Sequence, residues 1–197
     1  MSADRQPTFS AVLINYNHSQ YLSVTLNDVL NQTVPFDEII VIDDCSTDNS
    51  IKIINELIKD FPNARLVKNP KNLGIIPSYN IGLNQTKSDF IFCFSADDSY
   101  SKHIVEWCKN FLERYPDVAM IAGNIRTYNE GTGEERCFTL PFPQRAAVYM
   151  PQDLEMMARK TCMTFYGGAI IIRKDVMLSF GGYLESLKWH CDWFLYL

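Results

Sequence analysis

Two adjacent carboxylates, Asp97 and Asp98, follow closely on a short apolar run, Phe90 to Phe94. Such a run, rich in aromatic residues, is typical of a central strand that helices cover on both faces. In open α/β sheets, ligands bind just beyond the carboxyl ends of such strands. Two neighbouring acids there repel each other unless a cation or a ligand lies between them. The pair could therefore hold a divalent cation; the alternative is that both are solvated loop acids or caps of the next helix.

Further acidic residues follow other apolar runs in the same way. Asp43 and Asp44 come directly after residues 38–42, and Asp192 lies near the end of the chain. Because the carboxyl ends of parallel strands meet at one edge of a sheet, we expect Asp43 and Asp44 to face the same ligand as the first pair. The alternatives are that these two acids only cap the next helix, and that Asp192 is a first-turn acid of a last helix.

Tyr16 ends the first apolar run and could add a flat aromatic face, although a packed core aromatic is the alternative. One carboxylate can accept hydrogen bonds from a base or ribose, an aromatic ring can stack on the base, and a second carboxylate can hold a cation that bridges phosphates. This set of groups predicts a nucleotide-diphosphate site. The glycine-rich fingerprint of dinucleotide-binding proteins and the phosphate-loop signature are both absent, and residues 15–19 stand where the former would be. A dehydrogenase or a P-loop enzyme is therefore disfavoured.

The composition of the chain limits which binding partners and which cellular compartment we expect for it. The 197 residues carry a net charge of −5, which argues against nucleic acid or an anionic membrane as the main partner. The N-terminus has no apolar signal region, and no apolar run approaches the roughly 20 residues that span a bilayer. The six cysteines are scattered without a CxxC pair, so we expect small buried hydrophobes rather than disulfides or zinc ligands. We expect a cytoplasmic protein, with peripheral attachment at the inner membrane through missing regions as an alternative.

The first half of the chain alternates between strand and helix patterns. Strands are predicted at residues 9–14, 38–42, 64–68 and 90–94, with helices at 20–31, 51–61 and around 79–83 between them. This alternation predicts right-handed crossovers between parallel strands. The expected fold class is therefore α/β, with a Rossmann-like, mostly parallel central sheet and helices on both faces.

The second half of the chain is less regular. It predicts a helix capped by Ser101, a strand within 118–128, a turn at 129–133, a short helix from Pro151, a strand at 169–173 and a helix at 174–180. The chain then stops at Leu197, within an apolar helical pattern. We therefore expect one domain over residues 1–197, as a C-terminally truncated fragment of a longer chain.

Ten short segments, in this order and at this spacing, resemble glycosyltransferase family 2, whose members adopt the GT-A fold. They are Val12–Asn17, Leu30–Thr33, Ile40–Asp48, Asn72–Gly74, Asn80–Leu83, Ser95–Asp98, Gly167–Gly168, Ile172–Arg173, Phe180–Tyr183 and Cys191–Asp192. The resemblance covers residues 9 to 197. It implies that the expected domain is a glycosyltransferase catalytic domain.

The resemblance implies a nucleotide-binding role for five residues. Tyr16 would stack on the base. Asp44 would contact a uracil ring, with Asp43 as a weaker second candidate. Asn80 falls in a matching segment and joins this group, and Asp97 would lie near the ribose or the metal.

The resemblance also implies the chemistry. Asp98 would bind Mn²⁺ or Mg²⁺ on the diphosphate, and Asp192 would be the general base that deprotonates the acceptor hydroxyl. The sequence departs from the family pattern at three positions. Ser95 replaces the first acid of the common Asp-x-Asp, Cys191 replaces the Glu of a common Glu-Asp pair, and Tyr79 stands where many relatives carry Arg.

The expected function is an inverting, metal-assisted transfer of a sugar from a nucleotide-diphosphate donor, expected to be a UDP-sugar, to an acceptor hydroxyl. The acceptor would be a carbohydrate or a lipid-linked molecule, as in cell-surface polysaccharide synthesis. Two alternatives remain. One is a nucleotide-sugar-binding module without turnover, and the other is a nucleotidyltransferase that acts on sugar phosphates.

Overall fold

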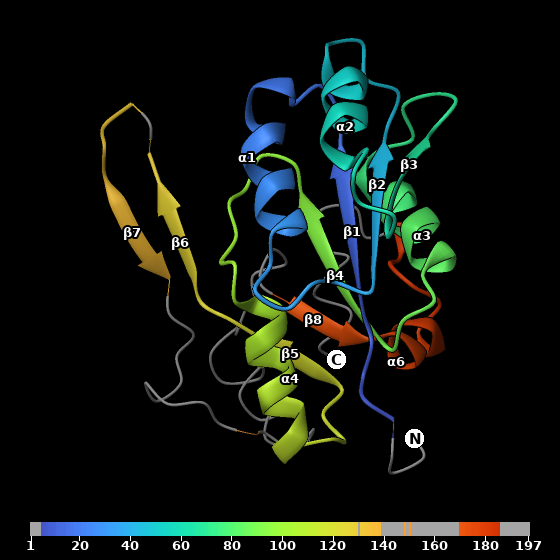
Figure 1. Ribbon diagram of the computed structural model, residues 1–197, viewed down its shortest axis with the longest axis vertical. Helices are drawn as coiled ribbons and strands as arrows, with labels where there is room; N and C mark the ends of the chain where they lie inside the picture. The colour runs from blue at the N-terminus through green and yellow to red at the C-terminus, as the bar shows by residue number, and fades with distance from the viewer. Residues whose placement is uncertain (1–4, 130, 139–147, 149, 151–169, 186–197) are drawn as a thin grey trace.

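A six-stranded sheet lies at the centre of the molecule, in the strand order β3-β2-β1-β4-β8-β5 (Figure 1). The computed structural model describes residues 5–129, 131–138, 148, 150 and 170–185. The elements are β1 (Phe9–Asn15), α1 (Ser19–Leu30), β2 (Glu38–Asp43), α2 (Ser50–Ile58), β3 (Ala64–Lys68), α3 (Ile75–Gln85), β4 (Phe90–Ser95), α4 (Ile104–Arg114), β5 (Met120–Ala122), β6 (Ile125–Tyr128), β7 (Glu135–Phe138), β8 (Ile170–Arg173) and α6 (Lys174–Ser179).

The first four strands of the sheet are parallel, as the sequence predicts. β1 pairs with β2 on one side and with β4 on the other, and β3 extends the sheet beyond β2. β8 runs antiparallel between β4 and β5. Every residue of β1 is buried, which explains why this central parallel strand is mainly apolar, with Ser10 and Asn15 as its polar residues. The predicted α/β class with a mostly parallel sheet is confirmed.

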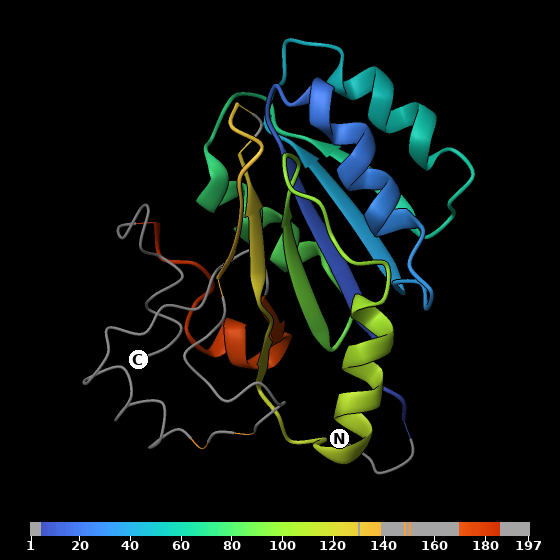
Figure 2. The same ribbon diagram turned by 90° about the vertical axis from the view of Figure 1, so that its left-hand side faces the viewer.

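Helices cover both faces of the sheet, because successive strand residues point to opposite sides. Figure 2 shows α1, α2 and α4 on one side and α3 and α6 on the other. The core is accordingly divided into two clusters. The first includes Leu13, Leu26, Ile54 and Leu112, and the second includes Val12, Leu83 and Met177.

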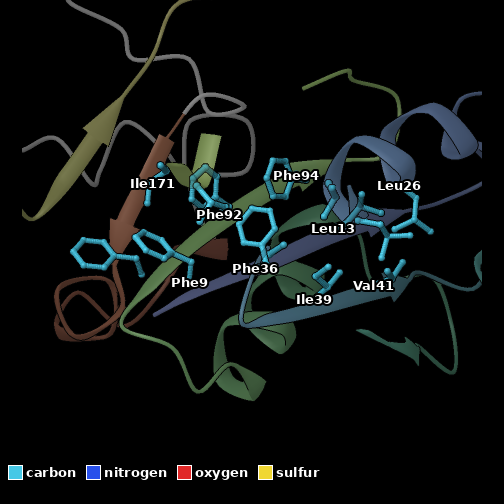
Figure 3. Packing of buried hydrophobic residues seen from close by; sticks show 14 of the residues in the cluster. Phe9, Leu13, Leu26, Phe36, Ile39, Val41, Phe92, Phe94 and Ile171 are labelled. Carbon is cyan, nitrogen blue, oxygen red and sulfur yellow. The ribbon is translucent and has the colours of Figure 1, made fainter. Parts of the chain in front are cut away.

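The larger cluster is built around aromatic rings. Phe36 meets the rings of Phe92 and Phe94 edge-on, at centroid distances of 5.2 and 5.8 Å. Figure 3 shows these rings on the same face of the sheet as Leu13 and, from α1, Leu26. Such edge-to-face contacts add about 0.5–1.5 kcal/mol per pair to the energy of burial. They fix β4, and with it the start of the loop that carries Asp97 and Asp98.

One local prediction is incomplete and another is wrong. The strand predicted within residues 118–128 is two strands, β5 in the main sheet and β6 in a separate hairpin with β7, because Gly123 and Asn124 interrupt the run. Ser101 does not cap α4, which begins at Ile104 after an N-cap at His103. The predicted turn is confirmed as the β6–β7 connection, where the Gly133 amide donates to the Asn129 carbonyl at 2.7 Å. Pro151 lies outside the described residues.

The described cysteines are free thiols, as expected, but Cys108 is the one buried cysteine among them, because Cys45 and Cys93 are of intermediate exposure. Cys108 is buried, and burial raises the pKa of its thiol to about 12, while Cys137 is exposed and departs from the expected buried position. Within the part of the chain that the structure describes, no helix combines the length and the apolar character needed to cross a bilayer.

Gly82 allows α3 to lie directly on β1. A Cβ at this position would lie 2.3 Å from Cγ1 of Val12. Gly82→Ala should therefore lower the free energy of unfolding by about 1–3 kcal/mol. In the double variant with Val12→Ala, the loss should be smaller than the sum of the two single losses by about 0.5–3 kcal/mol, because removing the valine methyl groups makes room for the new one. Urea unfolding of the four proteins measures both quantities.

Gly131→Ala is the matched control, since its added Cβ would meet Asn129 Oδ1 at an ordinary 3.4 Å. Strictly additive losses for Gly82→Ala and Val12→Ala would contradict the proposed steric conflict.

Candidate glycosyltransfer site

Three strand ends meet at one edge of the sheet and bring the two acid pairs together. The arrowheads of β1, β2 and β4 point to the same end of the molecule in Figure 1. Asn15 at the end of β1 is level with Asp43 of β2, and Ile14 is level with Ser95 of β4. Since neighbouring strands lie about 4.8 Å apart, the ends of β2 and β4 are roughly 10 Å apart, with the end of β1 between them.

Asp43 and Asp44 are both buried but point in opposite directions, because successive residues of a strand alternate between its faces. Asp43 lies on the side of α1 and α2. Its Oδ2 accepts a hydrogen bond from Asn15 Nδ2 at 2.8 Å, and its Oδ1 accepts one from the Ser46 amide at 2.9 Å. Asp43 therefore fastens the turn after β2 to the end of β1.

Asp44 lies on the side of α3 and holds the loop that leads into this helix. Its Oδ1 accepts hydrogen bonds from Asn69 Nδ2 at 2.7 Å and from the Leu73 amide at 2.9 Å, and its Oδ2 accepts one from the Gly74 amide at 2.8 Å. Gly74 is the N-cap of α3 and has φ 90°, a conformation that favours glycine. A carboxylate offers about four acceptor positions, so one remains for a ligand.

The backbone around Tyr16 is held in an unusual conformation while its side chain stays 41% exposed. Asn17 and Cys45 have φ angles of 55° and 67°, which non-glycine residues seldom adopt. Ser46 Oγ accepts a hydrogen bond from the Asn17 amide at 3.0 Å, and Asn17 Oδ1 accepts one from the Thr47 amide at 2.8 Å. The loops after β1 and β2 therefore hold each other in place through these hydrogen bonds, and Tyr16 is partly exposed beside them.

The second acid pair has fewer hydrogen-bond donors. Ser95 Oγ donates to Asp97 Oδ1 at 2.5 Å, and the Tyr100 hydroxyl donates to Asp98 Oδ2 at 3.2 Å. Burial, and then the negative charge of Asp97, raise the pKa of the Asp98 carboxyl, while the hydrogen bond from Tyr100 acts in the opposite direction. Ionised Asp98 is therefore a carboxylate that a positive charge would stabilise.

This donor set fits a divalent cation of the Mg²⁺ or Mn²⁺ type. Carboxylate oxygens are hard ligands, and such cations are usually bound by one or two carboxylates together with substrate phosphates. Among the residues that the structure describes, no group of three or more His, Cys, Asp or Glu side chains could hold a metal ion. Asp97 and Asp98 could therefore share a cation with a diphosphate, but would not enclose it alone.

Asn80 and Tyr79, at the middle of α3, bind protein groups. Both ends of the Asn80 amide pair with the backbone of Tyr183: Nδ2 donates to its carbonyl and Oδ1 accepts from its amide, each at 2.9 Å. Burial raises the pKa of the Tyr79 hydroxyl well above its ordinary value, and this hydroxyl donates to the Phe94 carbonyl at 3.1 Å. Asn80 therefore lies apart from Asp43 and Asp44 and fixes the chain after α6. Asp192, Gly167, Gly168 and Cys191 lie outside the described residues.

The sequence analysis missed the residues of α1 that hold the loop after β4. The Thr25 hydroxyl donates to the Ala96 carbonyl at 2.9 Å, and Asp28 Oδ2 accepts hydrogen bonds from Ser99 Oγ and the Tyr100 amide, both at 2.9 Å. Polar residues at positions 25 and 28 share one helix face, which is the signal that could have revealed them.

The family model for glycosyl transferase family 2 matches residues 10–178. This chain belongs to that family. A curated glycosyltransferase of Haemophilus influenzae, itself uncharacterized, is 30% identical over 131 residues, which are 66% of this chain and 39% of the relative. The chain spans about two fifths of the length of the first curated relatives it matches.

Solved structures share the fold of this glycosyltransferase. S. aureus TarS 1–349 aligns with a TM-score of 0.71 and 21% identity over 92% of this chain and 51% of TarS 1–349. TarS 1–349 has also been solved with UDP-GlcNAc, with a TM-score of 0.70. The mannosyltransferase PcManGT of Pyrobaculum calidifontis, solved with GDP-Man and Mn²⁺, aligns with a TM-score of 0.64 and 17% identity over 92% of this chain and 48% of its own. The GT-A fold is therefore confirmed.

Asp98→Asn should raise the melting temperature of the ligand-free glycosyltransferase at neutral pH. A carboxyl whose folded-state pKa lies above its ordinary value of 3.8 holds its proton more tightly in the folded protein, so its ionisation destabilises the fold. This penalty is absent below pH 3.8 and complete above the raised pKa. The gain from Asp98→Asn should therefore appear as the pH rises through this window. Thermal unfolding followed by circular dichroism from about pH 3 to pH 8 measures it.

Asp60→Asn is the control, because Asp60 is exposed and its one recorded charge partner is Lys59 at 4.0 Å. A variant Asp98→Asn that melts below the wild type at neutral pH would show that the Tyr100 hydrogen bond outweighs the repulsion from Asp97.

Proposed function

We propose that this glycosyltransferase transfers a sugar from a UDP-sugar to an acceptor hydroxyl, with inversion at the anomeric carbon and with help from a divalent cation. The observation that carries the proposal is the common edge of the sheet that Asp43 and Asp44 share with Asp97 and Asp98, with Tyr16 between the two pairs. The complexes of TarS with UDP-GlcNAc and of PcManGT with GDP-Man and Mn²⁺ support a nucleotide-sugar donor for this chain too.

The base and ribose would bind on the β1–β2 side. Tyr16 stacks on the base through its exposed ring, and Asp44 accepts a hydrogen bond from the uracil ring at the fourth acceptor position of its carboxylate. Asp43 serves mainly to hold the turn after β2 in place. Asn80 supports the chain at Tyr183 rather than the nucleotide.

The diphosphate would bind on the β4 side. Asp98 holds the cation and Asp97 lies near the ribose or shares the cation, since both follow the end of β4. The cation, when bound, neutralises negative charge on the departing diphosphate. Because Asp98 is buried next to Asp97, its carboxylate gains more from a positive charge than a solvated acid would.

Asp192 takes the proton of the acceptor hydroxyl in this scheme. The acceptor oxygen then forms its bond to the anomeric carbon as the bond from that carbon to the diphosphate oxygen breaks, and UDP leaves with the electron pair. This role rests on the resemblance of Cys191–Asp192 to the family pattern. We propose a carbohydrate or a lipid-linked molecule as the acceptor.

Mn²⁺ should raise the affinity of the protein for UDP by at least about tenfold, equivalent to about 1.4 kcal/mol, and Asp98→Asn should abolish this gain. The reason is that the cation links the Asp98 carboxylate to the diphosphate. Isothermal titration of UDP with and without Mn²⁺ measures the effect, with Asp60→Asn as the control that keeps it. Binding that is independent of metal and unaffected by Asp98→Asn would contradict the proposed site.

Asp192→Asn should leave UDP binding unchanged and lower turnover roughly 10²- to 10⁴-fold, the usual contribution of a general base. Turnover is measured as UDP released from a panel of UDP-sugars with carbohydrate acceptors. Asp117→Asn, on the exposed stretch before β5, is the control. Full turnover by Asp192→Asn would remove this residue from the proton transfer. A wild-type protein that binds donors without releasing UDP would favour the binding module, and release of pyrophosphate would favour a nucleotidyltransferase.

A further inference from the structure

The helix α1 carries a stripe of polar residues that faces the loop after β4. Thr25 and Asp28 lie three residues apart and so share one side of the helix, and Gln32 follows just after the helix ends at Leu30. Thr25 is 0% exposed and Gln32 is 8% exposed, so both need hydrogen-bond partners inside the protein. They find them in the backbone between Ala96 and Val105.

Thr25 holds the turn that presents Asp97. The turn is closed by a hydrogen bond from the Asp98 amide to the Ser95 carbonyl, at 3.4 Å. The Thr25 hydroxyl lies within hydrogen-bond distance of the carbonyls of both Ala96 and Asp98, on either side of Asp97. Since a hydroxyl has a single proton to donate, the two carbonyls share it, and both are drawn to one point on α1.

Asp28 holds the same loop from its other end. Its Oδ2 accepts hydrogen bonds from Ser99 Oγ and from the Tyr100 amide. The hydroxyl of Tyr100 accepts a hydrogen bond from the Ser95 amide at 3.1 Å and donates to Asp98 Oδ2. The position of the Asp98 carboxylate thus depends on α1 through Tyr100 as well as through Thr25.

The first residue of α1 is fastened to the loop that follows β2. The Ser19 amide donates to Asp48 Oδ2 at 3.0 Å, and Asp48 Oδ1 accepts from the Ser50 amide at the start of α2. Burial raises the pKa of the Asp48 carboxyl, but the hydrogen bonds from Ser50 and Ser19 together outweigh it and lower the pKa to about 2. One rigid helix of 12 residues therefore joins the loop of one acid pair to the loop of the other.

We propose that Thr25 is a positioning residue that keeps Asp97 and Asp98 in the arrangement in which they share a divalent cation with a diphosphate. This inference rests on the proposed function. Two adjacent carboxylates repel each other, and a loop free to move would separate them. By fixing the carbonyls on both sides of Asp97, Thr25 opposes that movement before the cation binds. Because Thr25 is 0% exposed, it would act through this loop and not by contact with the nucleotide or the cation.

The test compares Thr25→Val, which keeps the shape but removes the hydroxyl, with Thr25→Ser, which keeps the hydroxyl. The quantity measured is the factor by which Mn²⁺ raises UDP affinity, from isothermal titrations with and without the metal. In Thr25→Val this factor should fall about three- to tenfold, the worth of one hydrogen bond, while UDP affinity without Mn²⁺ stays unchanged. Thr25→Ser should restore the wild-type factor. A factor unchanged in Thr25→Val would overturn the inference.

Thr33→Val is the matched control. The Thr33 hydroxyl also donates to a carbonyl of this loop, that of Lys102 at 3.2 Å, but Lys102 is further along the chain from Asp97 and Asp98 than Ala96 is. An equal fall in Thr33→Val would overturn the inference by showing general loosening of the loop. If Thr25→Val does not fold, Asp28→Asn takes its place and should lower the same factor; no change there would count against the inference. A wild-type protein without any effect of Mn²⁺ would overturn the proposed cation role, and the inference with it.

Discussion

A carboxylate near the end of a buried strand must find either hydrogen-bond donors or a positive charge, and this requirement organises the carboxyl edge of the sheet. Asp43 and Asp44 find donors in the protein, from amides and Asn side chains at the end of β1, in the loop after β2 and in the loop before α3. Among the described residues, Asp97 accepts a hydrogen bond from the Ser95 hydroxyl and Asp98 accepts one from the Tyr100 hydroxyl. The pKa of the Asp98 carboxyl is nevertheless raised. The fold therefore satisfies one pair and leaves the other to gain from a ligand.

The two acid pairs also differ in how firmly their loops are held, because they differ in their hydrogen-bond donors. Asp44 binds backbone amides of the loop that caps α3, so the loop and the acid fix each other. The left-handed conformations of Asn17 and Cys45 cost energy, which the hydrogen bonds of Ser46 and Asn17 offset. The β1–β2 side of the edge, where we propose that the nucleotide binds, is therefore held in place by the protein itself. The acids after β4 bind only the hydroxyls of Ser95 and Tyr100 among the described residues, and their loop is also held from α1.

The sheet and the positions of the acids could be predicted from the sequence, because apolar runs such as 90–94 alternate with helical patterns and each is followed by a polar turn. The opposite directions of the Asp43 and Asp44 side chains could also have been predicted, since they follow from the two-residue repeat of a strand. The partner of Asn80 was not, because Tyr183 lies 103 residues away and local pattern carries no such contact. Thr25 and Gln32 were missed because polar residues on a helix usually indicate a solvated face, whereas here both are buried.

The polar stripe of α1 is tolerated in the core because the rest of the helix packs so well. Leu22, Leu26 and Val29 are almost fully buried against β1 and β2, and each contributes about 1.5–3 kcal/mol by leaving water. Thr25 costs little beside them, since its hydroxyl is fully engaged. Repulsion between Asp97 and Asp98 acts against the turn that holds them, so the turn needs a support whose own stability does not depend on those charges. A helix fixed by apolar packing provides that support, and on this basis we propose that α1 keeps the two like charges side by side for a shared cation.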